Sequence, residues 1–240
     1  MRPAPRVSQL VLRRGLGNFR ARILPSPPRL SDDLVARFRG LSSANLADAM
    51  GRNQFMDPEI RQRTRLPLCG PALTVYARPG DNLMVHKALQ LVEPGDIVVV
   101  NTGDNRNGAV FGGMMCEVAV AAKAGGIIVD GAIRDVSDVE RLRFPAYSRT
   151  VSIGSCDKDG PGEINVPISC GGTVVMPGDI VVGDADGIAV VPQGHAAEVL
   201  ELVAKVIEYE KQRIAEIRGG NPWFPAIDAT LRAKGIIGPS

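Results

Sequence analysis

The segment VDGAIRD, residues 129–135, continues the apolar run Ile127–Val129 and ends in two charged side chains. The apolar run predicts a buried strand, and Gly125-Gly126 in front of it predicts a tight connection. Arg134 and Asp135 are therefore expected at the end of a buried strand, where α/β proteins commonly carry their functional groups. The segment thus predicts an α/β fold with a polar site beside the end of this strand.

Strand and helix patterns surround this segment without a strict β-α-β alternation. Pro94-Gly95-Asp96 and Pro177-Gly178-Asp179 each precede an Ile-Val-Val run, which predicts a tight turn and then a buried strand. Gly194 to Arg218 has apolar residues at helical spacing, which predicts a long amphipathic helix on the outside or between subunits. We expect an α/β core of packed strands flanked by helices. Strands are expected at residues 73–77, 96–100, 127–129, 146–153, 173–176, 180–182 and 188–191, and shorter helices at 31–38, 44–50, 81–91 and 113–124.

The composition excludes several classes of protein. Of the 240 residues, 45% are hydrophobic and 22% are charged, which is ordinary for a globular chain. No apolar run approaches the roughly 18 residues of a membrane span, so we expect no membrane association. The aromatic share of 4% is low for the stacking surfaces of single-strand binders, and no nucleic-acid partner is expected.

Cysteine and histidine usage narrows the chemistry further. The four cysteines form no CxxC pair, which argues against a disulfide scaffold and fits a cytoplasmic location. The chain has only two histidines, His86 and His195, so a histidine-rich transition-metal site is excluded. Any metal is expected to be a hard cation on oxygen ligands. His86 could reach a pocket from the helix at 81–91, although we expect it to be a core or interface residue, and we expect His195 to be solvated.

Charge is distributed unevenly along the chain. Residues 1–30 hold seven arginines and no acidic residue, although the whole chain has a net charge of only +2. Two interpretations are open: a nucleic-acid arm or organelle presequence, and an arm that lies on a neighbouring subunit or stays mobile. We expect three regions, namely a basic arm at 1–30, a catalytic domain at 31–218 and a C-terminal extension at 219–240.

The segment before the buried strand predicts an anion site. Phe111-Gly112-Gly113 leads into a helix, so the N–H groups of Gly113, Met114 and Met115 are expected to be free at its positive end. Arg134 offers a fixed fork for a carboxylate or an enolate, and Asp135 is a typical ligand of a hard metal. The alternative is that Arg134 and Asp135 only cap the following helix or form salt bridges.

Several motifs together resemble the RraA-like family, in the same order over about residues 31–218. The family includes 4-hydroxy-4-methyl-2-oxoglutarate/4-carboxy-4-hydroxy-2-oxoadipate aldolases, which also decarboxylate oxaloacetate, and the regulator of ribonuclease E activity. The resemblance implies a single swivelling β/β/α domain with flanking helices, a homotrimer or hexamer with sites between subunits, and Mg²⁺ or Mn²⁺ as cofactor. The motifs are Pro79-Gly80-Asp81-Asn82, Phe111-Gly112-Gly113, VDGAIRD, Pro177-Gly178-Asp179 and residues 184–192.

The resemblance also implies roles for single residues. Asp135 would be the direct metal ligand, and Arg134 would bind the keto or enolate oxygen of the substrate. The backbone from Gly112 to Met115 would hold the pyruvate carboxylate. Glu208 aligns with a glutamate that reaches metal-bound water from the neighbouring subunit.

One position departs from the family pattern, because the aldolases carry Asp where this chain has Gly113. Glu117 lies one turn later on the same helix face, so we expect it to replace part of the lost charge. The expected function is a divalent-metal-dependent lyase that cleaves a carbon–carbon bond in a 2-keto acid to give pyruvate, by aldol cleavage or oxaloacetate decarboxylation. The Arg134-Asp135 pair favours this function. Gly113 slightly favours the alternative, a non-catalytic regulator that binds an RNA-degrading enzyme.

Overall fold

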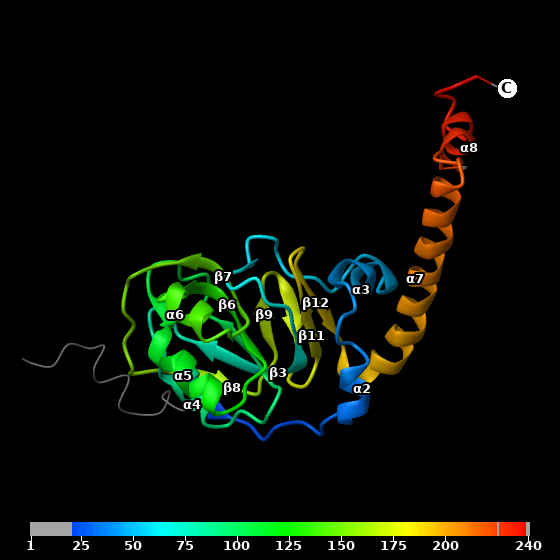
Figure 1. The fold of residues 1–240 in the computed structure, drawn as a ribbon. Helices are drawn as coiled ribbons and strands as arrows, with labels where there is room; N and C mark the ends of the chain where they lie inside the picture. Colours follow the sequence, from blue (N-terminus) through cyan, green and yellow to red (C-terminus); the bar gives the residue numbers. More distant parts are fainter. Residues whose placement is uncertain (1–20, 225, 239–240) are drawn as a thin grey trace, which may run out of the picture.

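A mixed sheet forms the centre of the molecule in the computed structural model, which describes residues 21–224 and 226–238 (Figure 1). Strands β3, β4, β6 and β7 run parallel, while β8 and β2 pair antiparallel at the two sides. Most of the predicted basic arm, residues 1–20, lies outside the described residues. The sheet path is β1 (Ala21–Ile23), β8 (Gly162–Ile164), β3 (Leu68–Ala77), β4 (Ile97–Asn101), β6 (Gly126–Ile133), β7 (Ala146–Val151) and β2 (Arg61–Gln62).

Strand β3 takes part in two pairings along its length. Its first half pairs antiparallel with β11 (Ile180–Gly183), which forms a hairpin with β12 (Ile188–Val191). Its second half pairs with β4, beginning at Ala72 opposite Ile97. The sequence predicted only this second half, so the observed strand begins five residues earlier than expected. The hairpin and the sheet therefore share one long strand, and the mixed α/β class is confirmed.

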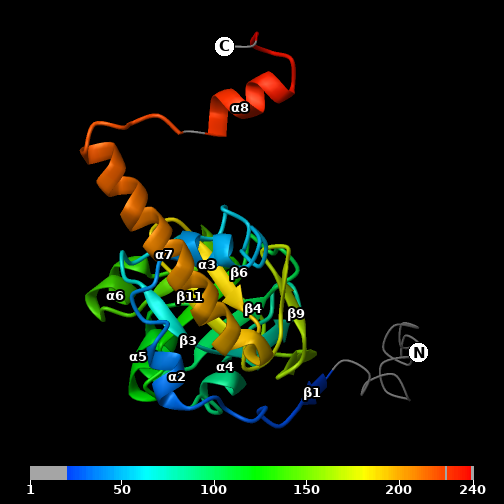
Figure 2. The same cartoon turned by 90° about the vertical axis from the view of Figure 1, so that its right-hand side faces the viewer.

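Helices cover the two outer sides of this arrangement (Figures 1 and 2). On one face of the sheet lie α4 (Leu83–Leu89), α5 (Gly113–Ala121) and α6 (Val136–Arg141). Beside the β11–β12 hairpin lie α2 (Asp32–Ala36), α3 (Ser43–Ala49) and α7 (Ala196–Arg218). Ser31 caps α2 as its sequence predicts, because its Oγ accepts a hydrogen bond from the Leu34 N–H at 3.3 Å.

Buried side chains form three clusters that match these layers. The first, between the sheet and α4–α6, contains Val85 and Val129. The second, between the sheet and the hairpin, contains Ile128 and Val181, and the third packs α2, α3 and α7 on Val191 and its neighbours. Successive residues of β6 thus alternate between the first and second clusters, as side chains of a strand do.

The two Pro-Gly-Asp turns predicted from the sequence have the same internal design. The Oδ2 of Asp96 accepts from the Glu93 N–H at 2.9 Å, and the Oδ2 of Asp179 accepts from the Met176 N–H at 2.8 Å. Both carboxylates are buried, and burial raises the pKa of each. Each aspartate therefore closes the tight turn in front of its strand, β4 or β11.

The long helix α7 extends away from the body, and α8 (Ala226–Ala233) lies beyond its far end (Figure 2). The first turns of α7 are buried through Val199, Leu200 and Val203. Among the residues that the structure describes, no helix combines the length and apolar character that crossing a membrane would require. The remaining elements are the strands β5 (Ala109–Phe111), β9 (Ile168–Cys170) and β10 (Thr173–Val175) and a 3₁₀ turn at Gln193–His195.

Candidate active site

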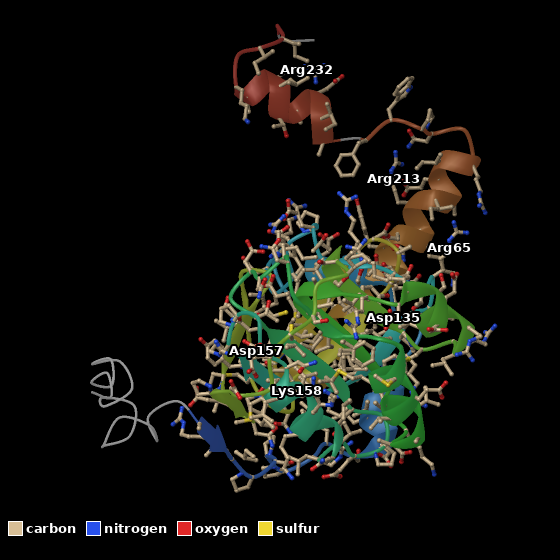
Figure 3. All side chains as sticks on the ribbon, turned by 90° about the vertical axis from the view of Figure 1, so that its left-hand side faces the viewer. Arg65, Asp135, Asp157, Lys158, Arg213 and Arg232 are labelled. Atoms are coloured by element: carbon tan, nitrogen blue, oxygen red, sulfur yellow. The ribbon has the colours of Figure 1, made fainter. Side chains whose placement is uncertain are left out.

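A pocket of about 260 Å³ lies where β6 ends and α5 begins. Figure 3 shows Asp135 and Lys158 on the face of the molecule that contains it. One part of the lining comes from the start of α5 and the end of β6, namely Gly112, Met114, Met115, Arg134 and Asp135. The other part comes from α4 with the residue before it and from the loop after β7, namely Asn82, His86, Ser155, Cys156 and Lys158.

Asp135 has an unusual backbone conformation, with φ 54° and ψ 39°, in the left-handed region. It stands at the N-cap position of α6 but makes no side-chain capping bond to that helix. Its Oδ2 instead accepts a hydrogen bond from the Gly113 N–H at 3.0 Å, at the start of α5. Asp135 therefore connects the end of β6 to the start of α5. The alternative that its side chain only caps the following helix is wrong.

Arg134 is held loosely beside this carboxylate. Its Nε lies 3.5 Å from the Asp135 Oδ2, and its Nη1 donates to the Ser155 Oγ at 3.2 Å. Both charged side chains remain accessible, with 35% of the Arg134 side chain and 43% of the Asp135 side chain exposed. A guanidinium has five N–H donors, so Arg134 keeps donors free for an anionic ligand.

Gly112 allows the start of α5 to approach this pair. A Cβ on Gly112 would lie 2.7 Å from the Asp135 Oδ2 and 2.9 Å from the Arg134 Cγ. The backbone of Gly112 is extended, with φ −161°, so the need for glycine comes from contact and not from an unusual φ. A side chain at position 112 would therefore displace the Arg134-Asp135 pair from the helix start.

The predicted anion site at the start of α5 needs one correction. Gly113 was expected to have a free N–H, but that group donates to Asp135. Within residues 21–224 and 226–238, the N–H groups of Met114 and Met115 have no hydrogen-bond acceptor. Two helix-start donors, not three, are therefore available to a ligand.

The two glutamates singled out in the sequence lie away from the pocket lining. Glu117 is exposed on α5, and its Oε1 lies 3.6 Å from Nη2 of Arg141. Glu208 lies on α7, on the opposite side of the molecule from α5 and α6 in Figure 1, and accepts from Gln212. One chain therefore does not bring Glu117 or Glu208 to the Arg134-Asp135 pair.

His86 lines the pocket, which is the less favoured of the two places expected for it from the sequence. Burial, together with the charge of Lys158, lowers the pKa of His86. Cys116, close to the pocket, is fully buried, and burial raises the pKa of its thiol to about 12. Cys116 therefore stays a protonated packing residue, and His86 favours its neutral form.

A larger and more open cavity, of about 720 Å³, lies at the other side of the sheet near Arg39, Cys69 and Asp184. The oxygens of Asp184 already accept hydrogen bonds from the N–H and hydroxyl of Ser43 and from the N–H groups of Asp186 and Gly187. Burial raises the pKa of the Cys69 thiol to about 11. Asp184 is thus occupied and the Cys69 thiol is protonated, so we place the candidate site at the smaller pocket.

The donor set around Asp135 decides which metal could bind there. Across the described parts of the chain, no three His, Cys, Asp or Glu side chains are grouped as metal ligands. Mg²⁺ commonly binds through one or two carboxylates and takes its other ligands from water and substrate. Asp135 carries the one carboxylate in the described lining of the pocket, which fits a cation of that kind and does not fit a closed protein cage.

Comparisons with known proteins identify relatives of this chain. The model of the RraA-like family, described as Aldolase/RraA, matches residues 43–190. A protein of Halalkalibacterium halodurans named "Putative 4-hydroxy-4-methyl-2-oxoglutarate aldolase" is 37% identical over 174 residues, which are 72% of this chain and 83% of the relative.

Two solved structures have the same fold. An uncharacterized protein of Pseudomonas syringae pv. tomato is 26% identical, with a TM-score of 0.70 over 81% of this chain and 96% of its own. Streptomyces coelicolor RraAS2, described as an unusual member of the RNase ES inhibitor RraA family, is 25% identical. Its TM-score is 0.70 over 79% of this chain and 100% of its own.

Proposed function

The chain belongs to the RraA-like family, and on that basis we propose that its pocket cleaves a carbon–carbon bond of a 2-keto acid to release pyruvate. The substrates would be aldols of the 4-hydroxy-4-methyl-2-oxoglutarate type, oxaloacetate, or both. The observation that most supports this function is the meeting of Arg134, Asp135 and the free N–H groups of α5 at one pocket.

In this proposal the residues of the chain bind the pyruvate half of the substrate. The N–H groups of Met114 and Met115 hold its carboxylate at the positive end of α5. Arg134 lies against the keto oxygen, where negative charge develops as the carbon–carbon bond breaks. Aldol cleavage and decarboxylation of oxaloacetate both leave the enolate of pyruvate, so one set of contacts serves both reactions.

In this proposal Asp135 would hold Mg²⁺ or Mn²⁺, and in a homotrimer or hexamer Glu208 of a second copy would complete the site. When bound, the cation supplies positive charge beside the carboxylate and keto oxygens of the substrate. Asp135 itself is fixed for this role by the Gly113 N–H, which holds one of its oxygens at 3.0 Å. Such support from a neighbouring donor orients a metal-binding carboxylate.

The test is an assay of pyruvate release from oxaloacetate and from 4-hydroxy-4-methyl-2-oxoglutarate, with Mg²⁺ and with EDTA. We expect release with Mg²⁺ and its loss in EDTA, and we expect Asp135→Asn to lack activity in both conditions. Asp157→Asn is a matched control, because Asp157 is an exposed carboxylate on the same face that does not line the pocket (Figure 3). This control should keep the activity of the wild type.

A second candidate function is that of a non-catalytic regulator of an RNA-degrading enzyme. The observation that favours it is Gly113, which leaves the first turn of α5 without an acidic side chain. The same assay separates the two functions. No metal-dependent release from either substrate, with Asp135→Asn equal to the wild type, would reject the lyase and favour the regulator.

A further inference from the structure

The short helix α8 has an apolar side that its own chain leaves uncovered. None of its eight residues is buried. Ile227 is 52% exposed, and Trp223, four residues earlier, is 79% exposed. Leu231, four residues later, continues the same stripe. A helix of eight residues is only marginally stable without tertiary contacts, so α8 needs a surface on which to pack.

The link between α7 and α8 fixes where α8 lies. Arg213 of α7 donates from Nη1 to the Asn221 carbonyl oxygen at 3.1 Å and from Nη2 to the Trp223 carbonyl oxygen at 2.6 Å. Its guanidinium also lies 5.9 Å from the centre of the Phe224 ring. Only 12% of the Arg213 side chain is exposed. The link is therefore held against the end of α7, and α8 lies beyond that end, away from the body of its own chain (Figure 2).

A groove of about 380 Å³, named here the α3 groove, lies between α3, the loop after it and the turn of the β11–β12 hairpin. Much of its lining is apolar and includes Ala44, Ala47, Met56 and Ile188. Phe55, also in the lining, is 50% exposed. The small side chains of α3 leave room for side chains of another helix, and amphipathic helices commonly dock in apolar grooves of this kind.

The charged groups of the α3 groove and of α8 are complementary. Asp48 and Asp186 line the groove together with a single basic residue, Arg52. The segment from residue 226 to residue 238 carries Arg232 and Lys234 with a single aspartate. The groove is thus net negative and the helical segment net positive. Docking of α8 in such a groove brings opposite charges together.

We propose that α8 docks in the α3 groove of a second copy of this chain, with Trp223 and Ile227 against Phe55. The α7–α8 link holds α8 away from its own body, whereas one chain carries both an uncovered apolar helix and an apolar groove of opposite charge. Two copies that exchange α8 cover both surfaces, because each supplies one helix and one groove. The contact lies outside the candidate active-site pocket and goes beyond the proposed function.

The first experiment uses Trp223, the single tryptophan of the chain, as the probe. At high protein concentration we expect blue-shifted emission and weak quenching by acrylamide, because the docked indole is shielded from water. Ala44→Arg alters the α3 groove at an exposed position and should shift the emission to the red, and Phe55→Ser is a second groove variant. Ile153→Arg changes an exposed isoleucine outside the groove, so this control should leave the emission unchanged.

The second experiment distinguishes a second copy from the same chain. A chain with Asp186→Cys and a chain with Lys234→Cys, each with a different affinity tag, are co-expressed and oxidised. We expect a disulfide-linked dimer that contains both tags. Glu140→Cys in place of Asp186→Cys is the control, because Glu140 is exposed on α6 outside the groove, and it should give no such dimer.

The outcomes do not depend on pyruvate release, so failure of the proposed function leaves this test intact. Blue-shifted emission that both groove variants lose, together with the mixed dimer, supports the inference. Emission of an exposed indole in the wild type at every concentration overturns it. Blue-shifted emission that neither groove variant changes also overturns it and assigns α8 to another partner. Groove-sensitive emission without a mixed dimer overturns the second copy and assigns α8 to the groove of its own chain.

Discussion

Two arginine–aspartate pairs lie on strand β6 or directly after it. They differ in burial and in how many of their hydrogen-bonding groups already have a partner. Arg149 of β7 is 8% exposed, and its Nε donates to Asp130 of β6 at 2.6 Å. Arg134 and Asp135 follow the same strand, are 35% and 43% exposed, and approach each other only to 3.5 Å. The first pair lies on the sheet face of Ile128, toward the hairpin, and the second pair lies beside α5.

The difference lies in unused hydrogen-bonding capacity. Asp130 also accepts from the Gly171 N–H at 2.7 Å, and Arg149 reaches Asp57 and Glu59 at 3.2 and 2.9 Å. These contacts raise the pKa of Arg149 despite its burial. A buried and saturated pair fixes loops to the sheet, whereas an accessible pair with free donors beside a pocket can bind a ligand.

The largest effect is expected from breaking the buried pair. Arg149→Met leaves Asp130 without its cationic partner, and an uncompensated buried charge costs about 3–5 kcal/mol of unfolding free energy. Chemical denaturation measures this loss. Arg106→Met is the control, because Arg106 pairs with Glu59 and Asp104 in the same network but is exposed, and little change is expected. Equal stability of both variants and the wild type would contradict the structural role of Arg149.

Breaking the accessible pair should give the opposite pattern. Arg134→Met removes the positive charge proposed for the keto oxygen, so turnover should fall by about 10²–10³-fold. The unfolding free energy should change by less than about 1 kcal/mol, because accessible ion pairs contribute little. Steady-state kinetics and chemical denaturation of one preparation give both values. A large loss of stability with Arg134→Met would remove the distinction between the two pairs.

The geometry of the accessible pair can be disturbed without changing either charge. Gly112→Ala places a Cβ 2.7 Å from the Asp135 Oδ2, so the pair must move away from the start of α5. A displacement of this kind should lower turnover by about tenfold or more. Gly187→Ala is a control with open space around its Cβ, and it should keep normal kinetics. Unchanged turnover in Gly112→Ala would mean that this close contact is not needed.

The smallest effect concerns the electrostatics of the pocket. Burial and the nearby charge of Lys158 lower the pKa of His86, so Lys158→Met should raise that pKa toward its usual value. A lowered pKa in the folded state gives stability that is present above the unfolded value and lost as pH falls through the folded one. NMR titration of the imidazole signals measures the shift. No upward shift in the variant would place Lys158 too far away to influence the pocket.

The accessible pair could be found from the sequence, and the buried pair could not. Arg134 and Asp135 directly follow an apolar run, so their place at a strand end is visible in the pattern. Arg149 stands among polar residues of a short strand, as an exposed residue would. Its burial arises from carboxylates on distant loops, such as Asp57 and Asp104, and no local pattern encodes that contact.

The pocket was likewise predicted mainly on its β6 and α5 side. Asn82, His86 and Lys158 come from segments far along the chain, so their meeting with Arg134 depends on tertiary packing. The Gly113 N–H was predicted to be free, but it donates to Asp135. The left-handed backbone of Asp135 turns its carboxylate back to α5, and the local sequence does not indicate that conformation. The three-residue strands β8 and β9 were missed because they are too short to show a period, whereas β10, which is equally short, was predicted.

The central claim is that Asp135 and Arg134 form the working part of the site, and Asp135→Asn tests it most directly. The measurement is the rate of pyruvate release from 4-hydroxy-4-methyl-2-oxoglutarate with Mg²⁺, compared between this variant and the wild type. We expect the rate to fall by about a hundredfold or more, with an unchanged unfolding midpoint. A variant that releases pyruvate as fast as the wild type would contradict the claim.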